Sequence, residues 1–132
     1  MELKIKIIIE ILGSPKEHVE KTINGVMEEL EKREIKILKK EVNKPKEVEK
    51  FFSTFADVEF ECKDWDVLID ICFDFMPSVV EIIEPLELKF EGKKMEELLN
   101  DLLAKLHKNS MMMRNLHAEN VQMKRELGRE NG

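Results

Sequence analysis

Residues 3–12, with the sequence LKIKIIIEIL, decide the fold of this chain. Apolar side chains occupy every second position from Leu3 to Ile11, and Ile8 and Leu12 add apolar character to the other side. Strict alternation is typical of a β-strand, and apolar residues on both sides favour a strand inside a sheet. We therefore predict that residues 3–12 form a central strand.

A helix is predicted directly after this strand. Gly13 interrupts the apolar pattern, Ser14 is a common N-cap residue, Pro15 suits the first helical position, and Glu17 stands where a capping box needs an acid. The segment that ends near Arg33 then places apolar side chains on one helical face, at Val19, Ile23, Val26, Met27 and Leu30.

Two more strands are predicted after the first helix. Residues 35–42 (IKILKKEV) contain three lysines, and lysine-rich strands usually lie at sheet edges, where charge discourages unwanted pairing. A polar connection over residues 43–50 leads to a strand in which acids alternate with apolar side chains, namely Ala56, Val58, Phe60 and Cys62.

A second helix and a last strand are predicted from residue 64 onward. Asp64 is placed to cap a helix over residues 65–76, and this helix is apolar over most of its circumference. Residues 79–83 (VVEII) begin a strand, which Pro85 interrupts before alternation resumes at Leu86, Leu88 and Phe90. Proline within a strand indicates an edge strand or a bulge.

The order strand, helix, strand, strand, helix, strand resembles the ferredoxin-like fold, including its ACT-like variants. The resemblance covers residues 3–91 and implies an α+β sandwich with an antiparallel sheet and two helices on one face. ACT-like regulators commonly bind amino acids at a glycine-containing loop, which makes Gly13 and Ser14 candidate ligand-binding residues by resemblance. Because this fold hosts many unrelated activities, the resemblance implies no reaction.

A long C-terminal helix is predicted after Gly92, because no proline or glycine occurs again until Gly128. Alternate steps of four and three residues reach ten positions, eight of them apolar: Met95, Leu99, Leu102, Leu106, Asn109, Met113, Leu116, Asn120, Met123 and Leu127. We call these ten positions the seam. Leu98 and Leu103 widen the apolar face over residues 93–107, so we expect that part to pack on the domain formed by residues 1–92.

The seam narrows over residues 108–127, which resemble a short leucine-zipper segment. With Leu99 at heptad position a, Asn120 is also at a and Asn109 is at d, and Glu119 can pair with Lys124 across a parallel dimer. We therefore expect a homo-oligomer, most simply a dimer, that associates through Asn109, Met113, Leu116, Asn120, Met123 and Leu127. A solvated, fraying helix or a contact with another protein through the methionines at 111–113 remains open, and residues 128–132 are expected to form a disordered tail.

Few residues indicate catalytic chemistry. Asp66, Asp70 and Asp74 lie on one helical face, where they form either a weak candidate site for a hard cation such as Mg²⁺ or a solvent-facing polar line. No nucleotide-binding, zinc-protease or serine-hydrolase motif occurs in the sequence, and we expect no catalytic residue and no cofactor. The sequence thus favours a non-enzymatic homo-oligomeric binding or scaffold protein over an ACT-like small-molecule sensor, with a metal-dependent enzyme ranked third.

Charge and composition exclude other classes. Residues 1–92 hold 14 basic and 22 acidic side chains, a net charge of −8, whereas residues 93–132 have a net charge of +2. An acidic body repels phosphate backbones, which argues against nucleic-acid binding by residues 1–92 and leaves such binding by the basic C-terminal segment as a minor alternative. The lack of a long apolar run and of a secretory signal predicts a cytoplasmic protein with no membrane partner. Cys62 and Cys72 are expected to be buried free thiols, and the abundance of Glu and Lys beside a single glutamine resembles thermophile composition.

Overall fold

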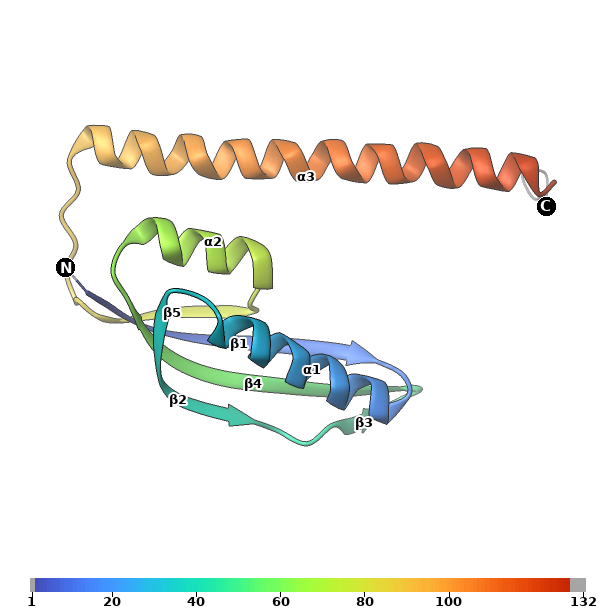
Figure 1. Ribbon diagram of the computed structural model, residues 1–132, viewed down its shortest axis with the longest axis horizontal. Helices are drawn as coiled ribbons and strands as arrows, with labels where there is room; N and C mark the ends of the chain where they lie inside the picture. Colours follow the sequence, from blue (N-terminus) through green and yellow to red (C-terminus); the bar gives the residue numbers. More distant parts are fainter. Residues whose placement is uncertain (1, 129–132) are drawn as a thin grey trace. The chain divides into compact units, whose positions relative to one another are not determined.

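A computed structural model describes residues 2–128, and the chain divides into two compact units, Met1–Lys89 and Phe90–Gly132. The first unit contains β1 (Leu3–Gly13), α1 (Lys16–Glu31), β2 (Ile35–Val42), β3 (Lys46–Val48), β4 (Phe51–Cys62), α2 (Trp65–Phe75) and β5 (Val79–Glu84); the second contains α3 (Gly92–Glu126) (Figure 1). The part of the chain that is described is therefore a mixed α+β protein with an open antiparallel sheet, two helices of moderate length and one long C-terminal helix.

The strands of the sheet follow the order β2-β4-β1-β5, and β3 pairs with a further stretch of β4. β1 pairs antiparallel with both β4 and β5, which confirms the prediction of a central first strand. β2 lies at one end of this order, so the prediction that the lysine-rich strand is an edge is also confirmed.

The core lies on one face of the sheet. Leu3, Ile5, Ile7 and Ile9 of β1 are at most 2% exposed, and they form one cluster with buried side chains from β4, α1 and α2. Successive side chains of a strand point to opposite faces, so these four β1 side chains all lie on one face. Because buried residues of α1 and α2 belong to the same cluster, both helices cover that face. Neither α1 nor α2 packs on the other face of the sheet, on which Ile8 lies, and we call it the open face.

The pairing of each edge strand, β2 and β5, contains one register shift, and the shift in β2 keeps the apolar side chains of that strand on the covered face. The pairing of β2 with β4 shifts between Ile37 and Lys39, so that Leu38 has no partner residue. Ile37 before the shift and Val42 after it therefore both pair with residues of β4 that face the helices. This bulge explains why apolar residues at odd and even positions of β2 share one face.

The expected capping box at the start of α1 is wrong. The N-cap residue is Pro15, no side chain caps the helix, and the backbone N–H groups of His18 and Val19 donate to the Pro15 carbonyl at 3.1 and 3.2 Å. β1 continues through Gly13, which pairs with Phe52, so the helix starts later than the sequence pattern suggested.

Two strand boundaries also differ from the prediction. The segment expected to be a polar connection contains β3, whose single apolar residue, Val48, pairs with Phe51; such a short strand has no alternation that a sequence pattern could reveal. The last strand ends at Glu84, and residues 85–91 form no strand. Glu84 already pairs with Lys4, near the beginning of β1, and Pro85 has no N–H group to continue the ladder.

Both remaining helix predictions are confirmed. The side chain of Asp64 accepts a hydrogen bond from the backbone N–H of Val67 at 3.1 Å, as expected for the cap of α2. α3 is continuous from Gly92 to Glu126, and Gly128 takes a left-handed conformation with φ of 69° just beyond its end. The expected disordered tail falls at residues 129–132 outside the described residues.

The two faces of β1 can be compared directly through Ile7 and Ile8. Ile7→Ala should lower the free energy of unfolding by about 2–5 kcal/mol, because it leaves a cavity in the core. Ile8→Ala removes the same atoms from the open face and should cost about 1 kcal/mol or less. Urea denaturation of both variants measures the difference, and equal losses would contradict the assignment of the faces.

Candidate functional site

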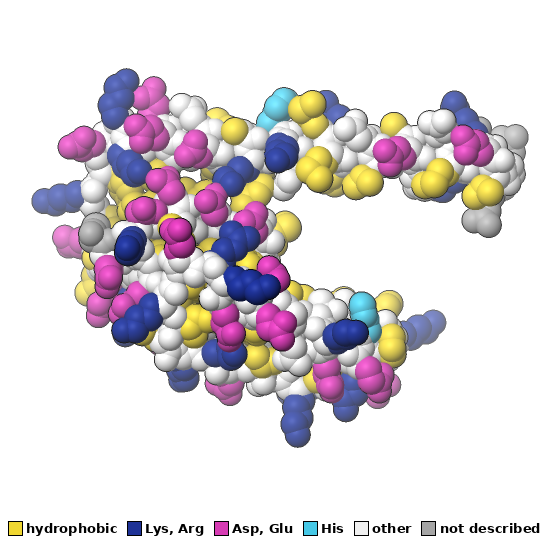
Figure 2. Space-filling view, viewed as in Figure 1, with side chains coloured by type: hydrophobic (Ala, Val, Ile, Leu, Met, Phe, Trp, Pro, Cys, Tyr) yellow, Lys and Arg dark blue, Asp and Glu magenta, His cyan; other side chains and the backbone are white. Residues whose placement is uncertain are grey.

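α3 presents an exposed apolar seam to the surroundings. Leu99, Leu106, Met113, Leu116, Met123 and Leu127 are each between 50% and 70% exposed, and Asn109 and Asn120 on the same stripe are also exposed. Figure 2 shows apolar side chains recurring along the C-terminal half of this helix. An exposed, largely apolar stripe of this length, interrupted only by Asn109, Asn120 and the partly buried Leu102, is uncommon on a monomeric protein and is typical of a contact surface.

The sequence supports α3 as a long continuous helix. Lys124 and Arg125 lie in the last turn, where basic side chains interact favourably with the helix dipole. The amide of Gln122 donates to the carboxylate of Glu126 at 3.4 Å, and Lys93 and Glu96 form an ion pair at 3.2 Å. Each of these local contacts stabilises the helix only weakly. Burial of the apolar seam against another surface would stabilise α3 more than these contacts do.

The seam is hollowed near its middle. A shallow, mainly apolar hollow of about 560 Å³ is lined by Leu106, Asn109, Ser110, Met113, Arg114 and His117. In heptad terms, four of these residues surround one hole of the kind that receives a side chain from a facing helix. Met112, at heptad position g next to the seam, is about half exposed, and its flexible side chain suits a contact surface that adapts to its partner; Met111, also about half exposed, is at position f on the opposite side of the helix.

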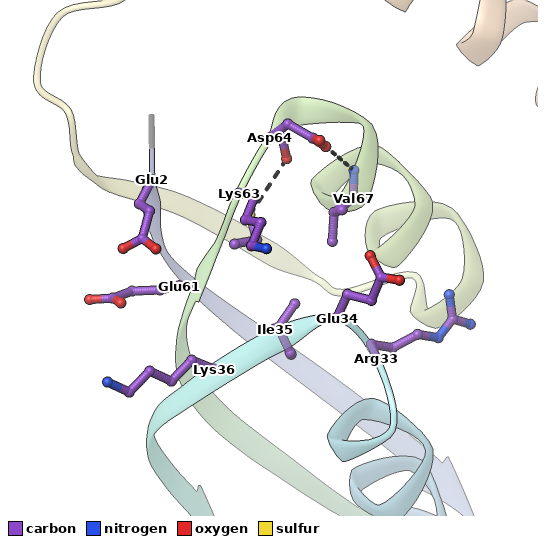
Figure 3. Close-up of a pocket in the computed structure, with 10 residues that line it drawn as sticks. Glu2, Arg33, Glu34, Ile35, Lys36, Glu61, Lys63, Asp64 and Val67 are labelled. Atoms are coloured by element: carbon purple, nitrogen blue, oxygen red, sulfur yellow. Dashed lines mark hydrogen bonds between the residues drawn. The ribbon is translucent and has the colours of Figure 1, made fainter.

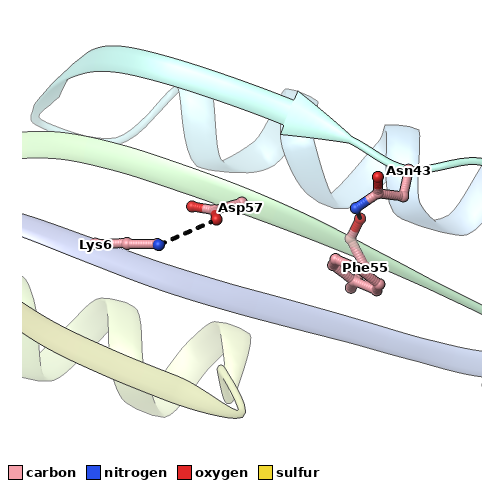
Figure 4. A network of polar contacts seen from close by, with 4 residues as sticks. All are labelled: Lys6, Asn43, Phe55 and Asp57. Carbon is pink, nitrogen blue, oxygen red and sulfur yellow. Dashed lines mark hydrogen bonds and ion pairs between the residues drawn. The ribbon is translucent and has the colours of Figure 1, made fainter.

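The open face of the sheet carries two rows of alternating charge, which we call the charged rows. They are defined by strand pairing and read, from β5 to β2, Glu84–Lys4–Glu61–Lys36 and Glu81–Lys6–Glu59–Lys39. Within these rows each strand contributes a single sign, and neighbouring strands carry opposite signs. Lys6 also forms an ion pair with Asp57 at 3.3 Å (Figure 4). The two rows are balanced in charge, and Glu10, Glu41 and Asp57 on the same face add negative charge, so this face offers no attraction to a polyanion.

A patch of apolar side chains lies beyond the charged rows on the same face. This end patch consists of Leu12, Val48, Phe51 and Phe55, which are between 43% and 62% exposed. Leu12 pairs with Ser53, which puts it diagonally between the two phenylalanines, and Val48 pairs with Phe51. Sequence reasoning missed this patch, although the spacing of Phe51 and Phe55 along one strand was a usable signal.

The line of acids on α2 has a basic neighbour that the sequence did not indicate. Arg33, which follows α1, forms an ion pair with Asp74 at 2.8 Å, and its guanidinium lies 5.0 Å from the centre of the Phe75 ring. Arg33 thus ties the end of α1 to the end of α2. Among residues 2–128 no three His, Cys, Asp or Glu side chains, Asp66 and Asp70 included, are grouped so that they could hold a metal ion.

A hollow of about 450 Å³ opens where β4 leads into α2 (Figure 3). Its charged lining residues carry both signs: Glu2, Arg33, Glu34, Lys36, Glu61, Lys63 and Asp64. Cys62 is also among its lining residues, and burial, with a smaller effect from the nearby Asp64 carboxylate, raises the pKa of the Cys62 thiol to about 11. A protonated thiol is a weak nucleophile, so this hollow lacks an activated group.

The candidate ligand residues are Gly13, the last residue of β1, and Ser14, which directly follows it. A Cβ atom added to Gly13 would meet the Val19 side chain at 3.5 Å, an ordinary contact, so space does not require glycine there. A hollow of about 420 Å³ near the start of α1 is lined by Lys16, Glu20, Ile23, Asn24, Val42, Asn43, Lys44 and Pro45. Gly13 and Ser14 are not part of its lining.

One known protein family matches this chain. The model of the MJ0538 family matches residues 4–129, nearly the whole sequence. The chain belongs to the MJ0538 family. Membership extends across both units and so includes α3 and its seam, but the name of the family states no activity. No sufficiently similar curated protein or solved structure was found.

The helices were also compared with the requirements of a lipid bilayer. Over the described residues, 2–128, no helix combines the length and the apolar character needed to cross a membrane.

The raised pKa of Cys62 leads to a test with iodoacetamide. At pH 9 the folded chain should be alkylated at Cys62 much more slowly than the chain unfolded in guanidinium, where the thiol has its ordinary pKa near 9. The thiol form is favoured in the folded state, so its contribution to stability is present below pH 9 and is lost as the pH rises toward 11. Mass spectrometry of the Cys62 peptide gives both rates, and equal rates would contradict the burial.

Proposed function

We propose that this protein is a non-enzymatic, homo-oligomeric binding or scaffold protein, a dimer whose copies associate through α3. The contact residues are Asn109, Met113, Leu116, Asn120, Met123 and Leu127. The observation that carries the proposal is the exposure of the four apolar contact residues of α3, since Met113, Leu116, Met123 and Leu127 are each at least half accessible.

The size of the hydrophobic contribution supports this proposal. Burial of a leucine or methionine side chain contributes roughly 1.5–3 kcal/mol relative to full exposure. In a symmetric dimer each seam position is buried twice, so even half-exposed residues supply a substantial driving force. Asn109 and Asn120 reduce that force, but a buried asparagine restricts which alignments of two helices are tolerated.

Leu116 provides the direct test of the proposal. Leu116→Asp places a charge in the seam and should convert the dimer to a monomer. The control Asn115→Asp adds the same charge one residue away, at a heptad position that faces outward, and should leave the dimer intact. Light scattering at micromolar concentration distinguishes the 15.6 kDa chain from twice that mass. A parent protein that is monomeric under these conditions would overturn the proposal.

We also propose that the first unit has the ferredoxin-like topology. Once the short β3 is set aside, the element order is strand, helix, strand, strand, helix, strand, and the second and last of these strands form the two edges. The coverage of one face by both α1 and α2 supports the same assignment.

We further propose a cytoplasmic location for the protein. Cys62 and Cys72 are both free, and free thiols persist in reducing compartments.

A second candidate function is small-molecule sensing of the ACT-like kind. It is favoured by the hollow of about 420 Å³ at the start of α1, close in the chain to Gly13 and Ser14. Lys16, Asn24 and Asn43 in its lining could bind the carboxylate or amino group of a small polar ligand.

Thermal denaturation with a panel of amino acids and nucleotides tests this second function. A ligand at about 100 times its dissociation constant should stabilise the fold by about 2.7 kcal/mol, which raises the melting temperature by several degrees. Lys16→Met should reduce that shift, whereas Lys46→Met, outside the hollow, should not. The absence of a shift with every compound would exclude a sensor for these two ligand classes.

A further inference from the structure

We infer that two copies of α3 pair in antiparallel orientation, with Asn109 of each copy opposite Asn120 of the partner subunit. This inference rests on the proposed self-association and adds the geometry of the contact. It differs from the parallel arrangement that the charges of Glu119 and Lys124 suggest from the sequence.

The heptad positions of the two asparagines lead to this geometry. With Leu99 at position a, Asn109 falls at d and Asn120 falls at a. In a parallel pair, each residue of the seam faces its own copy, so a faces a and d faces d. In an antiparallel pair a residue at a faces a residue at d, and Asn109 and Asn120 satisfy this requirement for each other.

The seam is symmetric about the midpoint between these asparagines. From residue 102 to residue 127 its eight positions run apolar, apolar, Asn, apolar, apolar, Asn, apolar, apolar, which reads the same in both directions. Antiparallel pairing about this midpoint matches Leu102 with Leu127, Leu106 with Met123, Asn109 with Asn120 and Met113 with Leu116, each pair formed twice. No seam position in this span is left without a partner of its own kind.

The chemistry of the asparagine side chain makes this alignment selective. An amide has one acceptor oxygen and two N–H donors, so two facing amides can satisfy each other. A shift of the antiparallel alignment by one heptad would place each asparagine against an apolar side chain, and a buried unpaired amide costs about 1–3 kcal/mol. Among the antiparallel alignments, this one therefore pairs both amides and buries six apolar positions of each copy.

The exposure of α3 fits the length of this contact. Leu106 is half exposed, and Met123 and Leu127 near the other end are at least half exposed, so the accessible stripe covers the span from residue 106 to residue 127, while Leu102 is partly buried. The hollow bounded by Leu106, Asn109 and Met113 would receive the partner's Asn120, with the polar Asn109 and Ser110 in its wall.

Charges beside the seam do not distinguish the two orientations. A parallel pair brings Glu119 near the partner's Lys124, and an antiparallel pair brings Lys105 near the partner's Glu126. Each orientation gains one attractive contact per copy, worth at most about 0.5–1 kcal/mol at an exposed site. The asparagine pairing and the symmetry of the seam therefore favour the antiparallel orientation over the parallel one.

A double-mutant cycle at the asparagines tests the orientation. The two positions lie 11 residues apart, about 16 Å along one helix, so they cannot touch within one copy. If the pair is antiparallel, Asn109→Leu or Asn120→Leu alone leaves an amide facing a leucine and should weaken the dimer at least tenfold. The double variant should restore or exceed the parent affinity, which gives strong coupling between the two sites.

A parallel dimer predicts the opposite sign for both single variants. Each would replace an asparagine pair by a leucine pair and tighten the dimer, and the two effects would add. That result would overturn the antiparallel inference while leaving the proposed dimer in place. A parent protein that stays monomeric would instead remove the proposed function, so the two failures can be told apart.

Disulfide cross-linking provides a second measurement that does not depend on affinity. In the antiparallel pair Leu106 faces the partner's Met123, whereas two copies of Leu106 are 17 residues apart, about 25 Å. Mild oxidation of mixed Leu106→Cys and Met123→Cys chains should therefore give a mixed disulfide, and either variant alone should give none. The parent, whose Cys62 is buried and whose Cys72 is half-buried, is the control. A Leu106→Cys homodimer would overturn the inference.

Discussion

The eleven-residue pairing of β1 with β4 is the constraint on which the rest of the first unit depends. It aligns Leu3, Ile5, Ile7 and Ile9 with the buried residues of β4, so one face of the central strands becomes a continuous apolar surface that α1 and α2 can cover. A shift of one residue would exchange the two faces and bring lysines and glutamates against the helices. The register shifts in the edge strands follow from this pairing. They fit each edge strand to the face that β1 and β4 have already determined.

The sequence predicted the elements whose signals are local. Alternation in residues 3–12, the cap at Asp64 and the lack of proline and glycine before Gly128 lie within single segments and led to β1, α2 and α3. β3 was missed because it has one apolar residue, and its existence depends on the neighbouring β4. The start of α1 was misplaced because β1 remains paired through Gly13, a tertiary effect that outweighs the preference of Ser14 for a helix cap.

The same distinction applies to the candidate sites. The seam of α3 was predictable because the heptad spacing is a property of one helix. The charged rows and the end patch were not, because they require knowledge of which residue of one strand lies beside which residue of the next. Arg33 and Asp74 are 41 positions apart, and only the packing of α1 and α2 against one sheet face brings their charges together.

The charged rows have a consequence for how copies of this protein meet. β2 contributes only lysines to them and β5 only glutamates, so each free edge of the sheet has its own sign. Two copies that approached through matching edges would bring lysines against lysines or glutamates against glutamates, and the unpaired Leu38 further interrupts the ladder at the β2 edge. The sheet thereby discourages symmetric extension of its own edges, so self-association of the proposed kind would have to use a surface other than these edges.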